Sequence, residues 1–354
     1  MTDRGIFLVA TPGLEQPLAD EAREAGFSGV TIVPGGVELS GGWPEVWRAN
    51  LVLRSATRVL VRAAAFRALH LAQLDKRARK LPWAELLRPD VPVRVEASCR
   101  KSRIYHAGAA AERIERAIRD VLGAPVISGA DDGNAVTVKL RIEDDMAVIS
   151  LDSSGESLHK RGHKEAVAKA PMRETMAAAF LRECGWRPGQ ALLDPMCGSG
   201  TFVIEAAEMA AGLLPGRSRH FAFEKFANFD AGIWAGLKAA ATVSEAAPVH
   251  YGRDRDAGAI RMSAANALRA GVDHLCRFET GAIADATPPE GPPGLIIINP
   301  PYGTRIGNKG PLFGLHAAMG EVMRARFGGW RVGIVTSEPA LARATGLPFR
   351  DPGP

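Results

Sequence analysis

The sequence has 354 residues, of which 46% are hydrophobic and 23% are charged, and its mean hydropathy is close to zero. These values indicate a globular chain of two or three domains and exclude a fibrous or disordered protein. The net charge is +5 and nearly all clusters of lysine and arginine precede residue 170, a distribution typical of proteins that contact nucleic-acid phosphates.

The first 50 residues predict a small α+β module. An apolar strand over residues 5–10 precedes an amphipathic helix over residues 14–27, and residues 30–41 read as two strands around a Gly-Gly turn. Residues 43–66 follow as one helix-like run that carries regularly placed arginines. We therefore expect residues 1–50 to form an N-terminal ferredoxin-like module.

Residues 51–155 contain the densest positive charge. Four cations fall within five residues of the segment LDKRARKLPW, and a strand over residues 91–106 leads into a helix that Gly123 closes. Residues 134–155 predict a hairpin whose turn lies at residues 143–145. This region is expected to be an RNA-binding domain.

From about residue 156 the pattern changes to helices alternating with short strands. They include strands with apolar residues on both faces, as in LIII at residues 295–298, which indicates a parallel sheet covered on both faces. They are expected at residues 191–195, 249–254, 276–281, 294–300 and 330–337. The polar, basic segment over residues 151–171 separates this α/β domain, residues 156–354, from the region before it.

A glycine-containing loop follows the first of these strands in ALLDPMCGSGTFVIEAA. Asp194 ends the strand, and Gly198 and Gly200 precede an alanine-rich helix. Glycine lets a backbone approach a ligand closely, and a helix start offers free N–H groups. The loop matches neither the Walker pattern nor the GxGxxG dinucleotide pattern. A tight turn that binds nothing is the alternative interpretation.

Two acids follow the second strand, in HYGRDRDAGAI. An acidic side chain at this place in an open α/β sheet can accept hydrogen bonds from the hydroxyls of a ribose. Asp254 is the first candidate because it is nearer the strand, whereas Asp256 is either a second candidate or the N-cap of the next helix.

The fourth strand ends abruptly in GLIIINPPYGTRIG. Asn299 can accept a hydrogen bond through its side-chain carbonyl, and Pro300 and Pro301 lack N–H groups and leave their own carbonyls as acceptors. Two acceptors can hold an exocyclic amine while Tyr302 stacks on the base that carries it. The alternative is a Pro-Pro turn with the tyrosine in the core.

The segments DPMCGSGTFVIEAA, GRDRDAGAI, INPPYGTRIG and FGGWRVGIVTS together resemble the S-adenosyl-L-methionine-dependent class I RNA methyltransferases that carry an N-terminal THUMP domain. The resemblance is strongest to the bacterial 23S rRNA guanine-N2-methyltransferases of the G2445 type. It implies a Rossmann-like methyltransferase domain with a mostly parallel sheet, preceded by an α+β ferredoxin-like and THUMP region. It also implies guanine N2-methylation of RNA as the activity.

The resemblance assigns a role to each motif. Asn299, Pro300, Pro301 and Tyr302 are expected at the target guanine. Asp194, Gly198 and Gly200, with their neighbours Pro195, Cys197 and Thr201, are expected at the methionine part of the cofactor, and Asp254 at its ribose. Arg173 and Glu174 match a motif that flanks the cofactor pocket, and an ordinary helix start with a salt bridge is the alternative interpretation.

Two features depart from the resembled family. Its members usually place an acid after the third strand to contact adenine, whereas this sequence has Ala282 near that position and Asp285 three residues on. The chain also stops before the closing hairpin of such sheets, so it is expected to be truncated or to have a smaller sheet. A long insertion over residues 212–241 resembles the rRNA-modifying branch and favours rRNA over tRNA.

The basic residues are expected to bind RNA backbone and to make that binding sensitive to salt. The candidates are Lys76, Arg77, Arg79, Lys80, Arg100, Lys101, Arg103, Lys160, Arg161 and Lys164. No metal site is expected, because the four cysteines lack CxxC spacing and the histidines lack ligand pairs. No apolar run is long enough for a signal peptide or membrane span, and a cytoplasmic location is expected.

Three other functions share these motifs. A tRNA guanine-N2-methyltransferase and a DNA adenine-N6-methyltransferase would use the same Asn-Pro-Pro-Tyr chemistry. A non-catalytic RNA-binding protein could keep the methyltransferase fold, although the glycines and Asn299 are intact.

Overall fold

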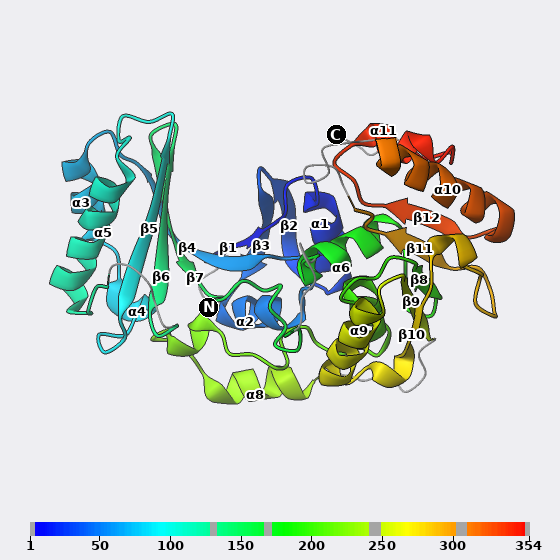
Figure 1. Cartoon of the computed structure of the whole chain (residues 1–354). Helices are drawn as coiled ribbons and strands as arrows, with labels where there is room; N and C mark the ends of the chain where they lie inside the picture. Colours follow the sequence, from blue (N-terminus) through cyan, green and yellow to red (C-terminus); the bar gives the residue numbers. More distant parts are fainter. Residues whose placement is uncertain (1–3, 128–132, 166–171, 241–248, 302–309, 351–354) are drawn as a thin grey trace. The chain divides into compact units, whose positions relative to one another are not determined.

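The computed structural model describes residues 4–127, 133–165, 172–240, 249–301 and 310–350 (Figure 1). The chain forms two compact units. Unit 1 contains residues 1–158 and 216–240, and unit 2 contains residues 159–215 and 241–354.

Unit 1 is built on one seven-stranded sheet, in the order β2-β3-β1-β4-β7-β6-β5. All neighbouring strands are antiparallel except β5 and β6, which run parallel. The strands are β1 (Arg4–Val9), β2 (Ser28–Val33), β3 (Gly36–Gly41), β4 (Arg58–Arg67), β5 (Val93–Arg100), β6 (Val136–Glu143) and β7 (Met146–Asp152). The predicted turn between β6 and β7 is confirmed, since Asp144 and Asp145 both adopt a left-handed backbone.

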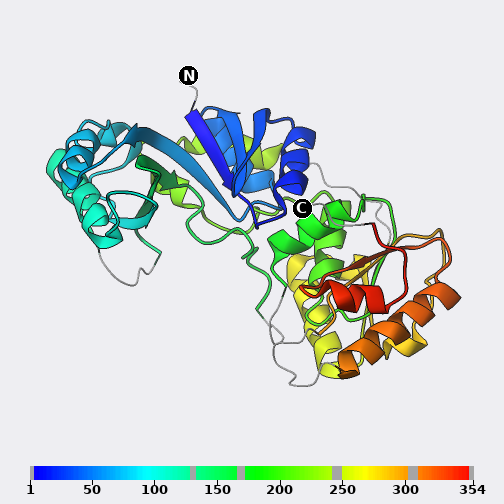
Figure 2. The same ribbon diagram turned by 90° about the horizontal axis from the view of Figure 1, so that it is seen from above.

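The helices of unit 1 are α1 (Glu15–Glu24), α2 (Trp43–Val52), α3 (Leu71–Ala78), α4 (Trp83–Leu86) and α5 (Ala107–Leu122). Helices α3 and α5 pack together, and α5 lies on β5 at one end of the sheet (Figures 1 and 2). Gly123 adopts a left-handed conformation at the end of α5, which confirms the predicted helix end.

The prediction of one helix-like run over residues 43–66 is wrong beyond residue 52. Helix α2 ends at Val52, and residues 58–67 form β4, the strand that joins the two halves of the sheet. Residues 58–61 of β4 pair with β1, and residues 60–67 pair with β7 on the other side. The buried, β-branched Val59 and Val61 alternate with less buried neighbours, a period of two that the surrounding arginines obscured.

Residues 216–240 pack with unit 1 although they follow the first helix of the α/β domain in sequence. They contain η1 (Ala222–Lys225) and α8 (Ala231–Ala239). The ring of Phe223 stacks on Trp47 of α2 with a centroid distance of 6.0 Å and meets Trp234 edge-on at 5.1 Å. Burial of these rings explains why the insertion leaves the α/β fold.

Unit 2 is built on a five-stranded parallel sheet in the order β10-β9-β8-β11-β12. The strands are β8 (Leu192–Asp194), β9 (His250–Asp254), β10 (Cys276–Thr280), β11 (Leu295–Ile298) and β12 (Arg331–Ile334). Each lies within its predicted range. The strand order reverses between β8 and β11, which makes their carboxyl ends a topological switch point.

Helices cover both faces of this sheet (Figure 1). Leu295 and Ile297 of β11 face one core with α6, α7 and α9, and Ile296 and Ile298 face a second core with α10. These two cores explain why β11 is apolar and buried at every position. The helices of unit 2 are α6 (Glu174–Glu183), α7 (Thr201–Ala210), α9 (Ala257–Ala270), η2 (Asp273–Leu275), η3 (Ile283–Asp285), α10 (Gly310–Arg326) and α11 (Pro339–Ala344).

Candidate active site

The predicted site residues of unit 2 gather at the carboxyl edge of the parallel sheet. Asp194 ends β8, Asp254 ends β9, and Asn299 follows β11 directly. Strand β8 lies between β9 and β11, and its residues pair in register with Tyr251, Gly252, Leu295 and Ile296. The glycine loop and the Asn-Pro-Pro segment therefore follow neighbouring strands at the switch point, where ligands of open α/β sheets bind.

The glycine loop has a fixed backbone. Gly198 and Gly200 have φ values of 54° and 81°, in the left-handed region that favours glycine. A Cβ atom on Gly200 would lie 3.0 Å from the side chain of Ser263, so this glycine is needed for close packing on α9. A Cβ atom on Gly198 would meet nothing within 4 Å, which leaves open space beside its backbone.

Asp254 holds the glycine loop to the end of β9. One of its carboxylate oxygens accepts a hydrogen bond from the Gly198 amide at 3.0 Å, and the other accepts from the Asp256 amide at 2.9 Å. The side chain of Asp256 is exposed and caps α9 by accepting from the Gly258 amide at 2.7 Å. The structure thus gives the two acids different roles, with Asp256 as the helix cap.

Asp194 is almost fully buried and its carboxylate accepts a hydrogen bond from the Met196 amide at 3.0 Å. Burial raises the pKa of this carboxyl to about 8, and the nearby negative charge of Asp254 adds to the increase. A positive ligand group beside Asp194 would favour its charged form. The α-ammonium and sulfonium of S-adenosylmethionine are groups of this kind.

Helix α9 binds the glycine loop through hydrogen bonds from two residues that the sequence analysis did not identify. The Ser263 hydroxyl donates to the Gly198 carbonyl at 2.9 Å, and the Asn266 amide donates to the Ser199 carbonyl at 3.1 Å. Arg269 donates to the Asn266 side-chain oxygen and to the His163 carbonyl. Polar residues at spacing i, i+3, i+6 in MSAANALRAG were the available signal.

The other loop residues are also buried. Cys197 donates its amide to the Arg253 carbonyl at 2.8 Å, and burial raises the pKa of its thiol well above the usual range. Pro195 is buried, and Thr201 is the first residue of α7. The Thr201 hydroxyl accepts a hydrogen bond from Lys164 at 2.9 Å.

Asn299 differs from these residues. Its side-chain oxygen is buried, and among the residues that the structure describes it has no hydrogen-bond partner. A buried amide oxygen without a partner costs free energy of about 1–3 kcal/mol. An oxygen in this state is ready to accept a hydrogen bond from a ligand. Pro300 is buried beside it, Pro301 is exposed, and Tyr302 lies outside the described residues.

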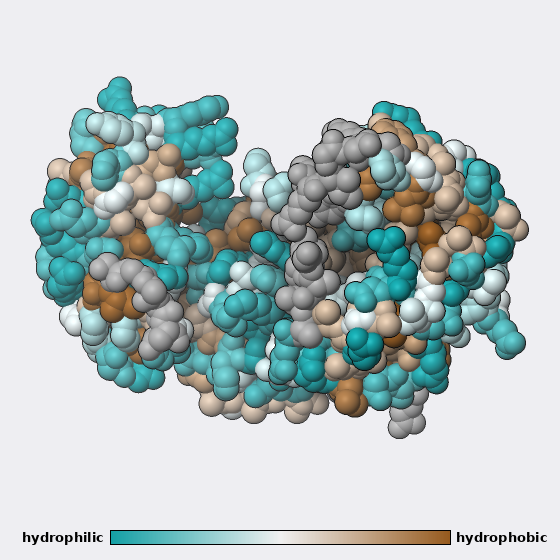
Figure 3. All heavy atoms as spheres, viewed as in Figure 1, coloured by the Kyte–Doolittle hydropathy of each residue, from teal (hydrophilic) through white to brown (hydrophobic). Residues whose placement is uncertain are grey.

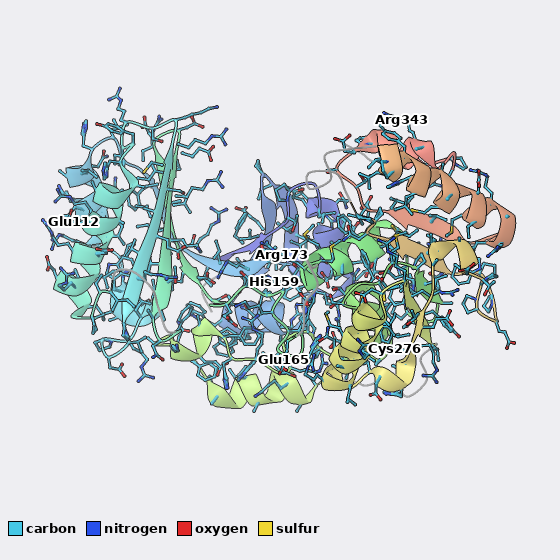
Figure 4. The ribbon with its side chains drawn as sticks, in the orientation of Figure 1. Glu112, His159, Glu165, Arg173, Cys276 and Arg343 are labelled. Carbon is cyan, nitrogen blue, oxygen red and sulfur yellow. The ribbon has the colours of Figure 1, made fainter. Side chains whose placement is uncertain are left out.

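The cations of the segment before α6 differ in burial. Arg161 is 2% exposed and pairs with the buried Glu205 of α7 at 3.3 Å. Lys164 pairs with the buried Glu174 at 3.2 Å. Arg173, directly before α6, is exposed (Figure 4). Arg161 and Lys164 therefore lie inside unit 2, where a phosphate does not reach them in this conformation.

Lys160 is exposed, as is Arg173. His159 precedes Lys160 in the chain and lies near Arg173 (Figure 4). Burial, together with the positive charges of these two residues, lowers the pKa of its imidazole to about 4. His159 is therefore neutral at neutral pH and adds no charge to this segment.

Asp285 ends η3, a short turn after β10, and is exposed. Its backbone carbonyl accepts a hydrogen bond from Arg253 at 3.1 Å, while Arg253 also pairs with Glu279 at 3.0 Å. Asp285 thus lies at the same edge of the sheet as Asp254. Its predicted contact with adenine remains a prediction.

The basic residues of unit 1 fall into two groups. Arg79, after α3, pairs with Asp75 at 2.8 Å and with Asp120 of α5 at 2.7 Å. Its neighbours Lys76, Arg77 and Lys80 are exposed. The second group is exposed at the end of β5 and in the loop after it, and it consists of Arg100, Lys101 and Arg103.

Within the described part of the chain, no group of three or more histidine, cysteine, aspartate or glutamate side chains could hold a metal ion. In the same residues, no helix is both long enough and apolar enough to cross a membrane.

Two family matches cover most of this architecture. Residues 161–348 match the family described as the RMKL-like methyltransferase domain, and residues 5–60 match the RlmL ferredoxin-like domain. The chain belongs to the RMKL-like methyltransferase family. The predicted class I methyltransferase fold, preceded by a ferredoxin-like α+β region, is confirmed.

A curated relative from Syntrophotalea carbinolica is named ribosomal RNA large subunit methyltransferase K/L. It is 37% identical over 358 residues, which cover 97% of this chain and 50% of the relative. The chain therefore spans about half the length of this relative.

Solved structures are similar over both units. A structure from Listeria monocytogenes, described as a predicted N6-adenine-specific DNA methylase, is 30% identical with a TM-score of 0.88, covering 98% of this chain and 92% of that one. A second structure, described as SMU.472, a putative methyltransferase complexed with SAH, is 26% identical with a TM-score of 0.87, covering 98% of this chain and 93% of that one. TrmN from Thermus thermophilus, 22% identical with a TM-score of 0.72 and coverage of 97% and 91%, shares the fold.

The residues present fit S-adenosylmethionine, the cofactor predicted from the sequence. Open space lies beside the Gly198 backbone, an acid at the end of β9 can accept from ribose hydroxyls, and Asp194 can balance positive charge. Among the described residues, Asp254, Gly198 and Asp194 are the ones that would hold it.

Proposed function

We propose that the chain is an S-adenosylmethionine-dependent RNA methyltransferase that methylates N2 of a guanine, with 23S rRNA as the favoured substrate. The observation that carries the proposal is the buried Asn299 oxygen without a partner among the described residues, beside the cofactor loop. The name of the Syntrophotalea relative supports rRNA as the substrate.

When bound, the cofactor supplies an activated methyl group on a positively charged sulfur. The Asn299 oxygen accepts one hydrogen of the guanine amine, and the Pro300 carbonyl accepts the other. These two bonds would leave the nitrogen lone pair free and aimed at the methyl group that the cofactor would donate. The amine then releases one proton to solvent. The protein thus orients the reactants and needs no strong base.

The target base must leave its stack to reach this site, because a base inside a duplex is inaccessible. Tyr302 is proposed to stack on the flipped guanine. Lys76, Arg77, Lys80, Arg100, Lys101, Arg103 and Lys160 are the exposed cations proposed to bind RNA phosphates. Arg79, Arg161 and Lys164 are weaker candidates, because each pairs with acids of its own unit.

A second candidate is N6-methylation of adenine in DNA. The name given to the Listeria structure favours it, and the same two acceptors would hold an adenine amine equally well. The basic surface of unit 1 is compatible with either nucleic acid.

The test is transfer of labelled methyl from S-adenosylmethionine to unmodified rRNA, tRNA and DNA, followed by digestion to nucleosides. The proposal predicts N2-methylguanosine from rRNA. Label in N6-methyl-2′-deoxyadenosine from DNA would establish the second candidate. N2-methylguanosine from tRNA alone would keep the activity and replace rRNA by tRNA as the substrate. Cofactor binding without transfer to any acceptor would contradict both.

A further inference from the structure

We propose that Tyr105, in the loop between β5 and α5, stacks on an unpaired RNA base and makes this loop a single-strand binding site. The loop consists of residues 101–106, which follow β5 and precede α5. The inference rests on the proposed function in one respect, that the ligand of unit 1 is RNA.

The exposure of Tyr105 is the first observation. Its side chain is 84% exposed, whereas its neighbour Ile104 is 5% exposed. Tyrosine normally buries most of its ring, and a ring this exposed is available to a ligand. None of the described rings or guanidinium groups packs against it.

The loop that presents the ring is held in place. The Ser102 hydroxyl donates to the Arg100 carbonyl at 2.7 Å and accepts from the Asp145 amide at 3.0 Å. The Arg103 amide donates to the Asp145 carboxylate at 2.8 Å. These bonds tie the loop to the turn between β6 and β7. A preordered loop loses less entropy when it binds a ligand.

The far end of the loop is also anchored. The His106 ring nitrogen accepts a hydrogen bond from the Ala109 amide at 3.0 Å and caps α5. Together with the buried Ile104 on its other side, this cap fixes the backbone around Tyr105. The ring is therefore exposed because of the loop structure and not because the segment is an unanchored end.

Positive charge lies next to the ring. Arg100 has a side chain that is 70% exposed and lies 3.6 Å from Glu143, and Lys101 and Arg103 are exposed as well. Glu143 also pairs with Arg141, and Asp145 binds the loop backbone. Figure 3 shows hydrophilic residues over this end of the β5–β6 pair. Cations beside an exposed aromatic ring are typical of surfaces that bind single strands.

The other basic group of unit 1, around Arg79, lies far from this loop. Arg79 contacts Asp120 near the end of α5, whereas the loop of Tyr105 precedes its start. A helix rises 1.5 Å per residue, so the two places are roughly 20 Å apart along α5. Of these two basic groups of unit 1, the one at the start of α5 has a strongly exposed ring within it, that of Tyr105.

The experiment measures binding of the full chain to a short fluorescent single-stranded RNA and to a duplex of equal length, over a range of salt concentrations. Tyr105→Ala is expected to weaken single-strand binding about 5- to 100-fold without changing the salt slope, because stacking contributes no counterion release. Tyr105→Phe keeps the ring and is expected to bind like the wild type. Arg103→Gln is expected to lower the salt slope by about one.

Val121→Ala, an exposed apolar residue near the end of the same helix, is the matched control and should have no effect. Equal affinity of Tyr105→Ala and wild type for the single strand would overturn the inference, whatever RNA the enzyme methylates. Equal loss of affinity in Tyr105→Phe would also overturn it, because stacking requires only the ring. Failure of the wild type to bind any RNA would instead count against the proposed function as well.

Discussion

The two halves of the candidate active site satisfy their polar groups in opposite ways. In the glycine loop, the backbone groups of Gly198 and Ser199 are bonded to Asp254, Ser263 and Asn266. In the Asn-Pro-Pro segment, the Asn299 oxygen is buried and lacks a partner among the described residues. The cofactor side is therefore already ordered, whereas the target side keeps an acceptor for its ligand.

This difference suits a reaction whose chemistry is mostly orientation. A preordered loop binds the cofactor without reorganising, and the bond that Asn299 lacks is made only when the target amine arrives. Removing Asn299 should therefore affect methyl transfer, and removing the bonds of the loop should affect cofactor affinity.

The largest expected effect is that of Asn299→Ala on the rate of methyl transfer. Loss of one orienting hydrogen bond in a dry site is expected to lower kcat about 10²- to 10³-fold. Single-turnover assays with saturating cofactor and rRNA measure this rate. Asn228→Ala, which changes an asparagine of unit 1, is the matched control. Equal rates for Asn299→Ala and this control would contradict the role of Asn299 on the target side of the site.

Asp254→Ala should give the next largest effect, on cofactor affinity. It removes one charge-assisted bond to the glycine loop, one to the Asp256 amide, and the acceptor for the ribose, so the Kd for S-adenosylmethionine is expected to rise about 10- to 100-fold. Calorimetric titration measures it. Asp256→Ala removes only the cap of α9 and should cost about 1 kcal/mol of stability with little change in Kd. The reverse ranking would reassign the ribose contact.

Asn266→Ala tests whether the bonds from α9 order the loop. The variant leaves the buried Ser199 carbonyl without its donor, so it is expected to cost about 1–3 kcal/mol in the free energy of unfolding and to weaken cofactor binding about threefold to tenfold. Leu268→Ala, an exposed residue of the same helix, is the control. Unchanged affinity in a destabilised Asn266→Ala would limit its role to folding.

The smallest effect concerns pH and Asp194. Its folded-state pKa is raised to about 8 from an ordinary value near 3.9, so between these values the unfolded chain has released a proton that the folded chain keeps. Stability from this group is present at low pH and is lost as pH rises toward 8. Asp194→Asn should remove that loss. The free energy of unfolding of the variant, relative to that of the wild type, should therefore increase by about 1 kcal/mol between pH 6 and pH 7. Chemical unfolding at each pH measures it, and parallel stability curves would contradict the raised pKa.

Much of unit 2 could be predicted because its signals are local. Apolar strands, a glycine turn and an acid at a strand end each lie within a few residues, and parallel topology brings the ends of β8, β9 and β11 together. The roles of Asp254 and Asn299 followed from that rule, and they stay predictions until ligand binding is measured.

Other features depend on contacts between distant segments. Arg161 looked like a surface cation, but its partner Glu205 is 44 residues away and both are buried. Strand β4 was not predicted, because its sequence resembles a helix and its pairing with β1 and β7 determines that it is a strand. The aromatic residues of the insertion gave no indication that they would pack on α2.

The most direct test of the account is a calorimetric titration of Asn299→Ala with S-adenosylmethionine, beside the wild type and Asp254→Ala. The account predicts that Asn299→Ala binds the cofactor like the wild type, because its oxygen is kept for the target amine. A loss of cofactor affinity as large as that of Asp254→Ala would show that Asn299 serves the cofactor, and would contradict the division of the site into two halves.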